Sequence, residues 1–308
     1  MAVVNKKIKA IFQALRPIQW IKNLSLFAAV ILNGQLLNYP IFLKSFLGFI
    51  VFCFLSSSSY LINDLVDVDK DRLHPVKKYR PIARGDISEA NAIFMAFILL
   101  FLGLFISVFI NFGFFWISLT FILLQYIYSF FLKKKAVIDI IGISLFFIIR
   151  AYAGELATGY HLPVWIMLAV IFLSLFLASG KRRSELGGSG TQTRSSLSGY
   201  SNSLLDFYTT MFAVCTLVAY AMFTFFEEPI TFNGLIHHYL LENFPKALGR
   251  KWYMITLLPV IFGIMRYGQV IYEMQEGERP EKIVATDIPL ILAIFSWGLV
   301  MITIIYVI

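Results

Sequence analysis

The stretch "INDLVDVDKDRLHPVKKYRPIARG", residues 62–85, lies between two long apolar runs. It contains four Asp residues and six Lys or Arg residues, in a chain where only 14% of residues are charged. A soluble domain carries about 25% charged residues. The stretch therefore predicts a charged site at the edge of a membrane-embedded protein.

Outside this stretch the chain is mostly apolar. Of its 308 residues, 59% are hydrophobic and 31 are Phe. Apolar runs of about 20 residues recur along the chain, as in polytopic helical membrane proteins. We predict an all-α protein with residues 1–308 forming one transmembrane domain. Its nine expected helices span residues 24–38, 41–62, 90–111, 113–132, 138–158, 163–180, 206–226, 252–272 and 287–307.

Loop charge predicts the orientation of these helices. If the N-terminus is cytoplasmic, the cytoplasmic segments carry 20 Lys and Arg residues and the external ones four. Positive charge gathers on the cytoplasmic side of membrane proteins. We therefore expect residues 1–23 to form a basic interfacial segment, and loops 63–89 and 181–205 to face the cytoplasm. Cations spread over such loops argue against nucleic acid as a partner.

The acidic residues have helical spacing. On a helix continuing the second span, Asp64, Asp67, Asp71 and His74 share one stripe with Asn63. Several carboxylates on one face repel one another unless a cation neutralises them, and oxygen-rich clusters suit Mg²⁺, which shares its coordination with substrate phosphates. The alternative is a solvated helix at the membrane edge, followed by a loop whose cations set only topology. We expect Pro75 to end the helix.

The same stretch resembles the first Asp-rich motif of the UbiA superfamily of intramembrane prenyltransferases. That resemblance implies a helical bundle whose cytoplasmic side opens into a cavity, where Asp residues and Mg²⁺ hold the diphosphate of a donor. It assigns the metal site to Asn63, Asp64, Asp67 and Asp71, with the three Asp residues as catalytic. Typical members carry a second Asp cluster after the sixth span. Here that position reads "FLASGKRRSEL", residues 176–186, which is basic.

This departure resembles a narrower branch of the superfamily, the decaprenyl-phosphate phosphoribosyltransferases. Further motifs agree with that branch: "LRPIQWIKN" at 15–23, "HPVKKYRPIARG" at 74–85, "YSFFLKKKAVIDI" at 128–140, "RAYAG" at 150–154 and "MRYG" at 265–268. The resemblance implies an Mg²⁺-dependent pentosyltransferase that moves 5-phosphoribose from 5-phosphoribosyl 1-diphosphate to a polyprenyl phosphate and releases diphosphate. The product would be a lipid-linked pentose precursor for a cell-envelope polysaccharide such as arabinan.

Both substrates carry phosphates, so cationic and polar residues at the cytoplasmic rim are candidate substrate ligands. These candidates are Lys22, Lys77, Arg80, Tyr128, Arg150, Lys181, Arg182, Arg183 and Glu185. Several of them have a simpler alternative. Lys22 and Tyr128 also suit interfacial anchors, and the cations at 181–183 suit a topology signal. Arg150 lies eleven residues after Asp139 on one helical stripe, about 16 Å away along the axis, which also suits a structural salt bridge.

Two other functions stay open. A UbiA-type prenyltransferase that joins a polyprenyl diphosphate to an aromatic acceptor would want acids at 181–205, where only Glu185 fits. A transporter or lipid flippase would place its ion site near the middle of the membrane, whereas this acidic stripe lies at the rim. We expect a multi-pass protein of a bacterial or archaeal cell membrane with its active site facing the cytoplasm. The acceptor's chain length and any homo-oligomer stay undetermined.

Overall fold

The computed structural model describes residues 2–73, 76–187, 195–227, 235–248, 250–274, 277 and 279–307. Within these ranges the chain is helical and has no strands. The helices are α1 (Ala2–Leu15), η1 (Pro17–Phe27), α2 (Ala28–Leu32), α3 (Tyr39–Val66), α4 (Val68–Leu73), η2 (Lys77–Tyr79), α5 (Glu89–Ile110), α6 (Phe112–Phe130), η3 (Leu132–Lys134), α7 (Ile138–Thr158), α8 (Val164–Gly187), η5 (Ser195–Gly199), α9 (Asn202–Phe226), α10 (Leu235–Asn243), α11 (Pro245–Leu248), η6 (Trp252–Thr256), α12 (Leu257–Tyr272), α13 (Pro280–Thr286) and α14 (Ile288–Tyr306).

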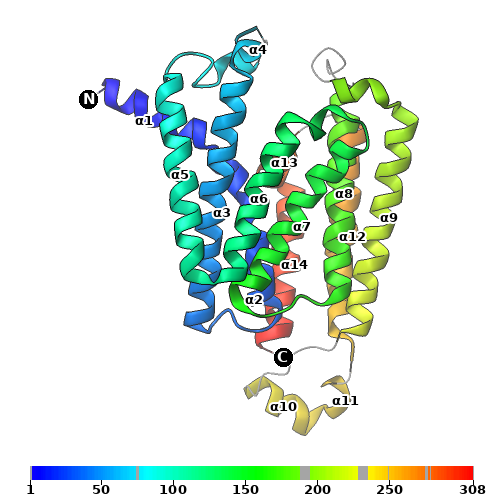
Figure 1. The fold of residues 1–308 in the computed structure, drawn as a ribbon. Helices are drawn as coiled ribbons and strands as arrows, with labels where there is room; N and C mark the ends of the chain where they lie inside the picture. Colours follow the sequence, from blue (N-terminus) through cyan, green and yellow to red (C-terminus); the bar gives the residue numbers. More distant parts are fainter. Residues whose placement is uncertain are drawn as a thin grey trace.

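The prediction of an all-α polytopic membrane protein is confirmed. Among the described residues, eight helical segments are long and apolar enough to cross a bilayer. They match the second to ninth predicted spans, most within a few residues at either end. In Figure 1 they form an upright bundle, with the two chain termini at opposite ends.

The bounds predicted for the first span, 24–38, are wrong. The corresponding apolar segment runs from Pro17 to Leu32. Pro17 favours a helix start because its ring presets a helical φ, and the segment ends before Gly34, which has a φ of 67°. The first eleven residues form a 3₁₀ helix. Since a 3₁₀ helix rises about 2.0 Å per residue, the whole segment extends about 30 Å, close to the thickness of a bilayer core.

Two further boundaries differ from prediction at the end of the bundle that carries the acidic stretch. Helix α8 continues to Gly187 instead of ending at 180, so Lys181 to Glu185 are helical. The expected helix over 62–74 is interrupted at Asp67, between α3 and α4. His74 and Pro75, like residues 188–194 of the predicted loop 181–205, lie outside the described residues.

The short helix η1 lies inside the bundle, against α3, α7 and α13. Helix α7 approaches it so closely that a Cβ atom at Gly154 would collide with the backbone of Leu26. Leu26 itself is fully buried beside Phe52 and Phe114. Asn23 of η1 is therefore held in the interior, while Gln19 and Lys22 are half-buried. Helices α1, α4 and α13 lie at one end of the bundle, and α10 and α11 at the other (Figure 1).

Candidate active site

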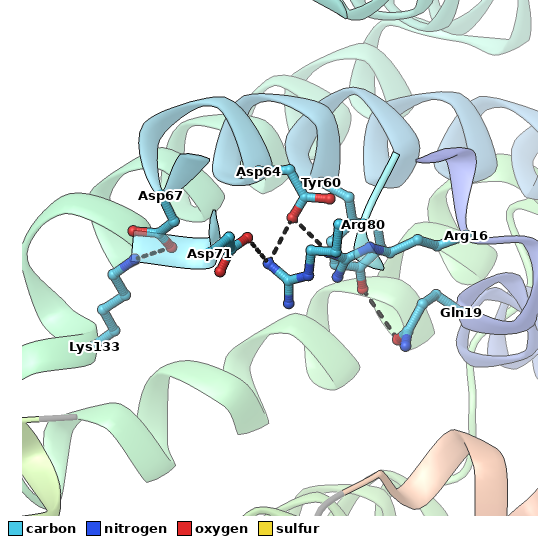
Figure 2. A network of polar contacts seen from close by, with 8 residues as sticks. All are labelled: Arg16, Gln19, Tyr60, Asp64, Asp67, Asp71, Arg80 and Lys133. Carbon is cyan, nitrogen blue, oxygen red and sulfur yellow. Dashed lines mark hydrogen bonds and ion pairs between the residues drawn. The ribbon is translucent and has the colours of Figure 1, made fainter. Parts of the chain in front are cut away.

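Asp64 and Asp71 meet on one guanidinium group. Nη1 of Arg80 lies 2.9 Å from Oδ1 of Asp64 and 2.6 Å from Oδ2 of Asp71. Both carboxylates are buried, whereas the Arg80 side chain is 28% exposed. Figure 2 shows Arg80 lying between the two acids. The predicted residues Asp64, Asp71 and Arg80 are thus brought together at one point.

Arg16 is a second cation on Asp64. Its Nη2 atom donates to Oδ1 of Asp64 at 2.5 Å, and its guanidinium lies 5.0 Å from the centre of the Tyr60 ring. Arg16 has a φ of 53°, in the left-handed region. For a residue with a Cβ this conformation costs about 1–2 kcal/mol. The backbone is therefore strained at the junction of α1 and η1, where the side chain reaches the acidic pair.

Asp67 points elsewhere. Its Oδ2 atom pairs with Nζ of Lys133 at 3.4 Å, away from Arg80 (Figure 2). The break in the helix at Asp67 is the physical reason, because it takes this residue out of the regular stripe. Asn63 is half-buried, and its carbonyl accepts the N–H of Asp67. In the described part of the chain, no group of three or more His, Cys, Asp or Glu residues is close enough to hold a metal ion.

The Asp64–Asp71 pair nevertheless fits a magnesium ion. Mg²⁺ is usually held by one or two carboxylates and completes its coordination with water and substrate phosphates. Burial raises the pKa of Asp71 above its ordinary value, against the opposing charges of Arg80 and Lys77. The ionised pair therefore depends on a cation between its members. In the structure that charge is supplied by the guanidinium of Arg80.

A second cluster surrounds Glu281 of α13. Its Oε1 atom accepts from Nε2 of Gln19 at 2.6 Å, and its Oε2 atom lies 3.1 Å from Nζ of Lys22. Although burial opposes ionisation, the charges of Lys22 and Lys181 lower the pKa of Glu281 to about 2. Of the two predicted phosphate ligands, Lys22 thus forms an ion pair with this buried carboxylate, and Lys181 acts on it through its charge.

Gln19 and Tyr60 connect the two clusters. The hydroxyl of Tyr60 donates to Oε1 of Gln19 at 3.3 Å, and Nζ of Lys22 donates to the same oxygen at 2.6 Å. Tyr60 also lies under Arg16, which reaches Asp64. A continuous set of polar contacts therefore runs from the acidic pair to Glu281.

Arg182 has a different environment from Lys181. It is fully buried, with Nε 2.7 Å from Oδ2 of Asp139 and Nη2 donating to the Tyr128 hydroxyl at 3.1 Å. It also forms an ion pair with Glu185. These contacts favour the structural alternative for Arg182, Glu185 and Tyr128, and their roles in substrate binding stay predictions.

Arg183 is engaged at the edge of the bundle. Its Nε atom donates to Oδ1 of Asp206 at 2.6 Å, and its guanidinium lies 5.8 Å from the centre of the Tyr272 ring. Neither contact points to the two clusters described above. Among the three adjacent cations of α8, the one near Lys22 and Glu281 is therefore Lys181.

Arg150 is buried but does not pair with Asp139. Its Nε atom donates to Oδ1 of Asn23 at 2.7 Å, and its Nη1 atom to the carbonyl of Phe146 at 2.7 Å. The guanidinium also lies 4.8 Å from the centre of the Phe121 ring. The close approach of η1 to α7 at Gly154 brings Asn23 within reach. The alternative of an Asp139–Arg150 salt bridge is therefore wrong, since Asp139 pairs with Arg182.

The sequence argument missed several residues of these clusters. Arg16, Gln19 and Asn23 belong to the motif "LRPIQWIKN", and Lys133 belongs to "YSFFLKKKAVIDI", so the motifs themselves were the available signal. Glu281 lies in none of the quoted motifs. Its position on a short helix between two spans shows its role only once the chain is folded.

The chain is similar to known proteins over most of its length. The UbiA prenyltransferase family matches residues 24–286. The chain is 36% identical to decaprenyl-phosphate phosphoribosyltransferase of Mycolicibacterium smegmatis, over 94% of this chain and 90% of that protein. It is 33% identical to the protein of the same name in Corynebacterium glutamicum, over 96% and 86%.

A solved structure also shares the fold. A UbiA homologue from Archaeoglobus fulgidus, bound to GPP and Mg²⁺, superposes with a TM-score of 0.67 at 21% identity, covering 96% of this chain and 99% of that one. At this identity the likeness concerns the fold alone. Because the family match covers well over half of the sequence and the helices follow the same architecture, the chain belongs to the UbiA prenyltransferase family.

Proposed function

We propose that this protein transfers 5-phosphoribose from 5-phosphoribosyl 1-diphosphate to a polyprenyl phosphate of the decaprenyl type, with release of diphosphate. This is the activity named for the relatives from M. smegmatis and C. glutamicum, which align with nearly the whole chain. The product is a lipid-linked pentose for cell-envelope polysaccharide. Neither of these two relatives is named for the aromatic prenyltransferase or the transporter alternative.

One structural observation carries the proposal. Where the family resemblance leads one to expect a second acidic cluster, Lys181 joins Lys22 at one end of the bundle. Two lysines suit a substrate with additional phosphate groups better than a second metal site would. The 5-phosphate of the donor and the phosphate of the acceptor supply those groups.

Asp64 and Asp71 are the residues that would hold Mg²⁺. Asn63 and Asp67 are further proposed ligands of smaller weight, since Asp67 pairs with Lys133 in the structure. When bound, the metal ion would stabilise the negative charge that develops on the leaving diphosphate. Arg80 forms an ion pair with Asp71, and the charge of Lys77 acts on it. Both residues would bind oxygens of the same diphosphate. Arg16 donates to the same oxygen of Asp64 as Arg80 does and helps to fix the orientation of that carboxylate.

In the transfer step, an oxygen of the lipid phosphate forms a bond to C1 of the ribose, and the bond from C1 to the diphosphate oxygen breaks. The nucleophile is an anion at neutral pH, so the protein needs no strong general base. Lys22 and Lys181 hold the phosphates in position. Attack opposite the leaving group gives a β-linked product from an α-linked donor.

We also propose that residues 1–308 act as one transmembrane domain with a cytoplasmic N-terminus and active site. Single cysteines in the 195–203 segment and at 241–246, in a variant lacking Cys53 and Cys215, test this orientation. A membrane-impermeant thiol reagent should label the first only from the cytoplasmic side and the second only from outside. The reverse pattern would place the active site on the external face.

The enzymatic test uses purified protein in detergent with ¹⁴C-labelled 5-phosphoribosyl 1-diphosphate, Mg²⁺ and decaprenyl phosphate. Label should appear in the organic extract, and it should not appear without the lipid or with EDTA. A parallel reaction with labelled geranyl diphosphate and 4-hydroxybenzoate tests the aromatic prenyltransferase alternative. Product in that reaction and none in the first would overturn the proposal.

A further inference from the structure

Two buried oxygen atoms near Lys181 form no hydrogen bond within the described chain. One is Oε2 of Glu281, which pairs with Lys22 only as an ion pair, and the other is the hydroxyl of Tyr267. Both side chains are more than nine-tenths buried. Buried polar groups in proteins nearly always have a hydrogen-bond partner. Two such atoms together indicate a ligand group that completes them.

The two atoms belong to one location. Tyr267 belongs to the same buried apolar cluster as Ile283 of α13, two residues after Glu281, and the charge of Glu281 reaches its hydroxyl. Helix α12 brings the Tyr267 ring against α8 at Gly180, where an added Cβ atom would lie 3.5 Å from the ring. Gly180 precedes Lys181, whose charge also acts on Glu281. The cluster borders the bundle surface through the half-buried side chains of Gln19 and Lys22.

The chemistry of the two atoms selects the kind of group that fits. An ionised carboxylate oxygen only accepts hydrogen bonds, whereas a phenol hydroxyl both donates and accepts. A phosphate oxygen is an anionic acceptor and is repelled by Glu281. An alcohol hydroxyl, in contrast, donates to Glu281 and accepts from Tyr267.

We propose that Glu281 and Tyr267 form a subsite for a hydroxyl group on the ribose of the donor. The inference rests on the proposed function and deepens it, because it names a determinant of donor choice. A prenyl diphosphate has no hydroxyl group, so it would leave the Tyr267 hydroxyl without a partner and Oε2 of Glu281 with only its ion pair to Lys22. Lys22 and Lys181 keep Glu281 ionised and hold the adjacent phosphates. Gln19 and Tyr60 connect this subsite to Asp64.

The test compares ligands that differ by one hydroxyl group. Affinities of 5-phosphoribosyl 1-diphosphate, its 2-deoxy and 3-deoxy analogues and inorganic diphosphate are measured by calorimetry at constant Mg²⁺. The unaltered protein should prefer the full donor to at least one deoxy analogue by about 10- to 150-fold, the range for a hydrogen bond to a charged group. Glu281→Gln should reduce that preference to near one and leave inorganic diphosphate affinity unchanged.

Glu273→Gln is the matched control, because Glu273 is an exposed carboxylate at the same end of α12. It should retain the preference. Tyr267→Phe should reduce the preference by a smaller factor, and it carries the test if Glu281→Gln does not fold.

Four outcomes would overturn the inference. If Glu281→Gln binds every ligand more tightly, Glu281 only competes with substrate phosphates for the neighbouring lysines. Equal weakening of every ligand would make it only structural. An unaltered protein that transfers phosphoribose without discriminating the deoxy analogues would remove the subsite but keep the proposed function. Failure of the unaltered protein to bind the full donor would remove both.

Discussion

The Asp64–Asp71 cluster and the buried Asp139–Arg182 pair lie at the same end of the bundle, and they differ in the exposure of their cations. In the first, the buried carboxylates Asp64 and Asp71 contact Arg80, whose side chain is 28% exposed. In the buried pair, Asp139 contacts Arg182, and both side chains are 0% exposed. The acids are buried in both clusters. What distinguishes the clusters is whether the cation can leave.

This difference distinguishes a candidate binding site from a structural ion pair. Arg80 comes from the loop after α4 and reaches the acids from the surface, so a metal ion or a substrate phosphate can displace or join it. Arg182 is enclosed by Asp139, Glu185 and Tyr128, and nothing can replace it without unpacking α7 from α8. A buried acid alone therefore does not mark an active site. The accessibility of its partner does.

The largest expected effect is on stability. Arg182→Met should lower the free energy of unfolding by about 3–5 kcal/mol, because it leaves Asp139 buried without its cation. The matched variant Arg80→Met should cost clearly less, because the Arg80 side chain is 28% exposed, water can reach the space it leaves, and Asp64 keeps Arg16. Denaturant titration in detergent micelles measures both. Similar losses for the two variants would remove the proposed distinction.

The next effect is on catalysis. Asp64→Ala should lower turnover by about 10²–10³-fold, the usual cost of losing a group that stabilises developing charge, while the protein stays folded. Asp69→Ala is the matched control, because Asp69 is exposed and pairs only with Arg72 among the described residues. Phosphoribose transfer at saturating donor is the measurement. Near-normal turnover of Asp64→Ala would refute the metal assignment.

A smaller effect concerns Lys181. A charge-assisted contact to phosphate is worth about 1.5–3 kcal/mol, so Lys181→Ala should weaken donor binding about 10- to 150-fold. Affinity for the donor lacking its 5-phosphate should hardly change. Arg183→Ala, which removes a neighbouring cation paired with Asp206, should leave both affinities unchanged. If Arg183→Ala and Lys181→Ala behave alike, the cations of α8 act only through overall charge.

The sequence predicts the spans well and the polar contacts less well, for a physical reason. Hydropathy identifies apolar helices, and eight spans follow it. Hydropathy predicts that α8 ends at its first charged residues. The helix nevertheless continues, and Arg182 stays inside the bundle because Asp139 and Glu185 neutralise its charge. Helical spacing likewise pairs Asp139 with Arg150 on one stripe. The structure pairs each with another helix, which spacing along a single helix cannot reveal.

Glu281 and Asp67 illustrate the same limit of sequence patterns: the pattern misses the first residue and misplaces the second. Glu281 lies on a seven-residue helix in a region that hydropathy assigns to a loop, and only packing against η1 brings it to Lys22. Asp67 has the right spacing for the acidic stripe, but one irregular residue in the backbone directs it to Lys133. Pattern predicts which residues are candidates, and the fold decides which of them meet.

The smallest expected effect is that of Asp67→Asn, and it tests the boundary of the first cluster. The Asp67–Lys133 pair is 3.4 Å long and its carboxylate is 31% exposed. Exposed pairs of this kind contribute about 0–1 kcal/mol, so turnover should fall by less than about 10-fold. Titration with Mg²⁺ gives the sharper measurement. Asp64→Asn should raise the Mg²⁺ concentration needed for half-maximal turnover far more than Asp67→Asn does. Equal increases would show that Asp67 leaves Lys133 and joins Asp64 and Asp71 when the metal binds, so that the acidic stretch acts as the complete stripe that its spacing predicts.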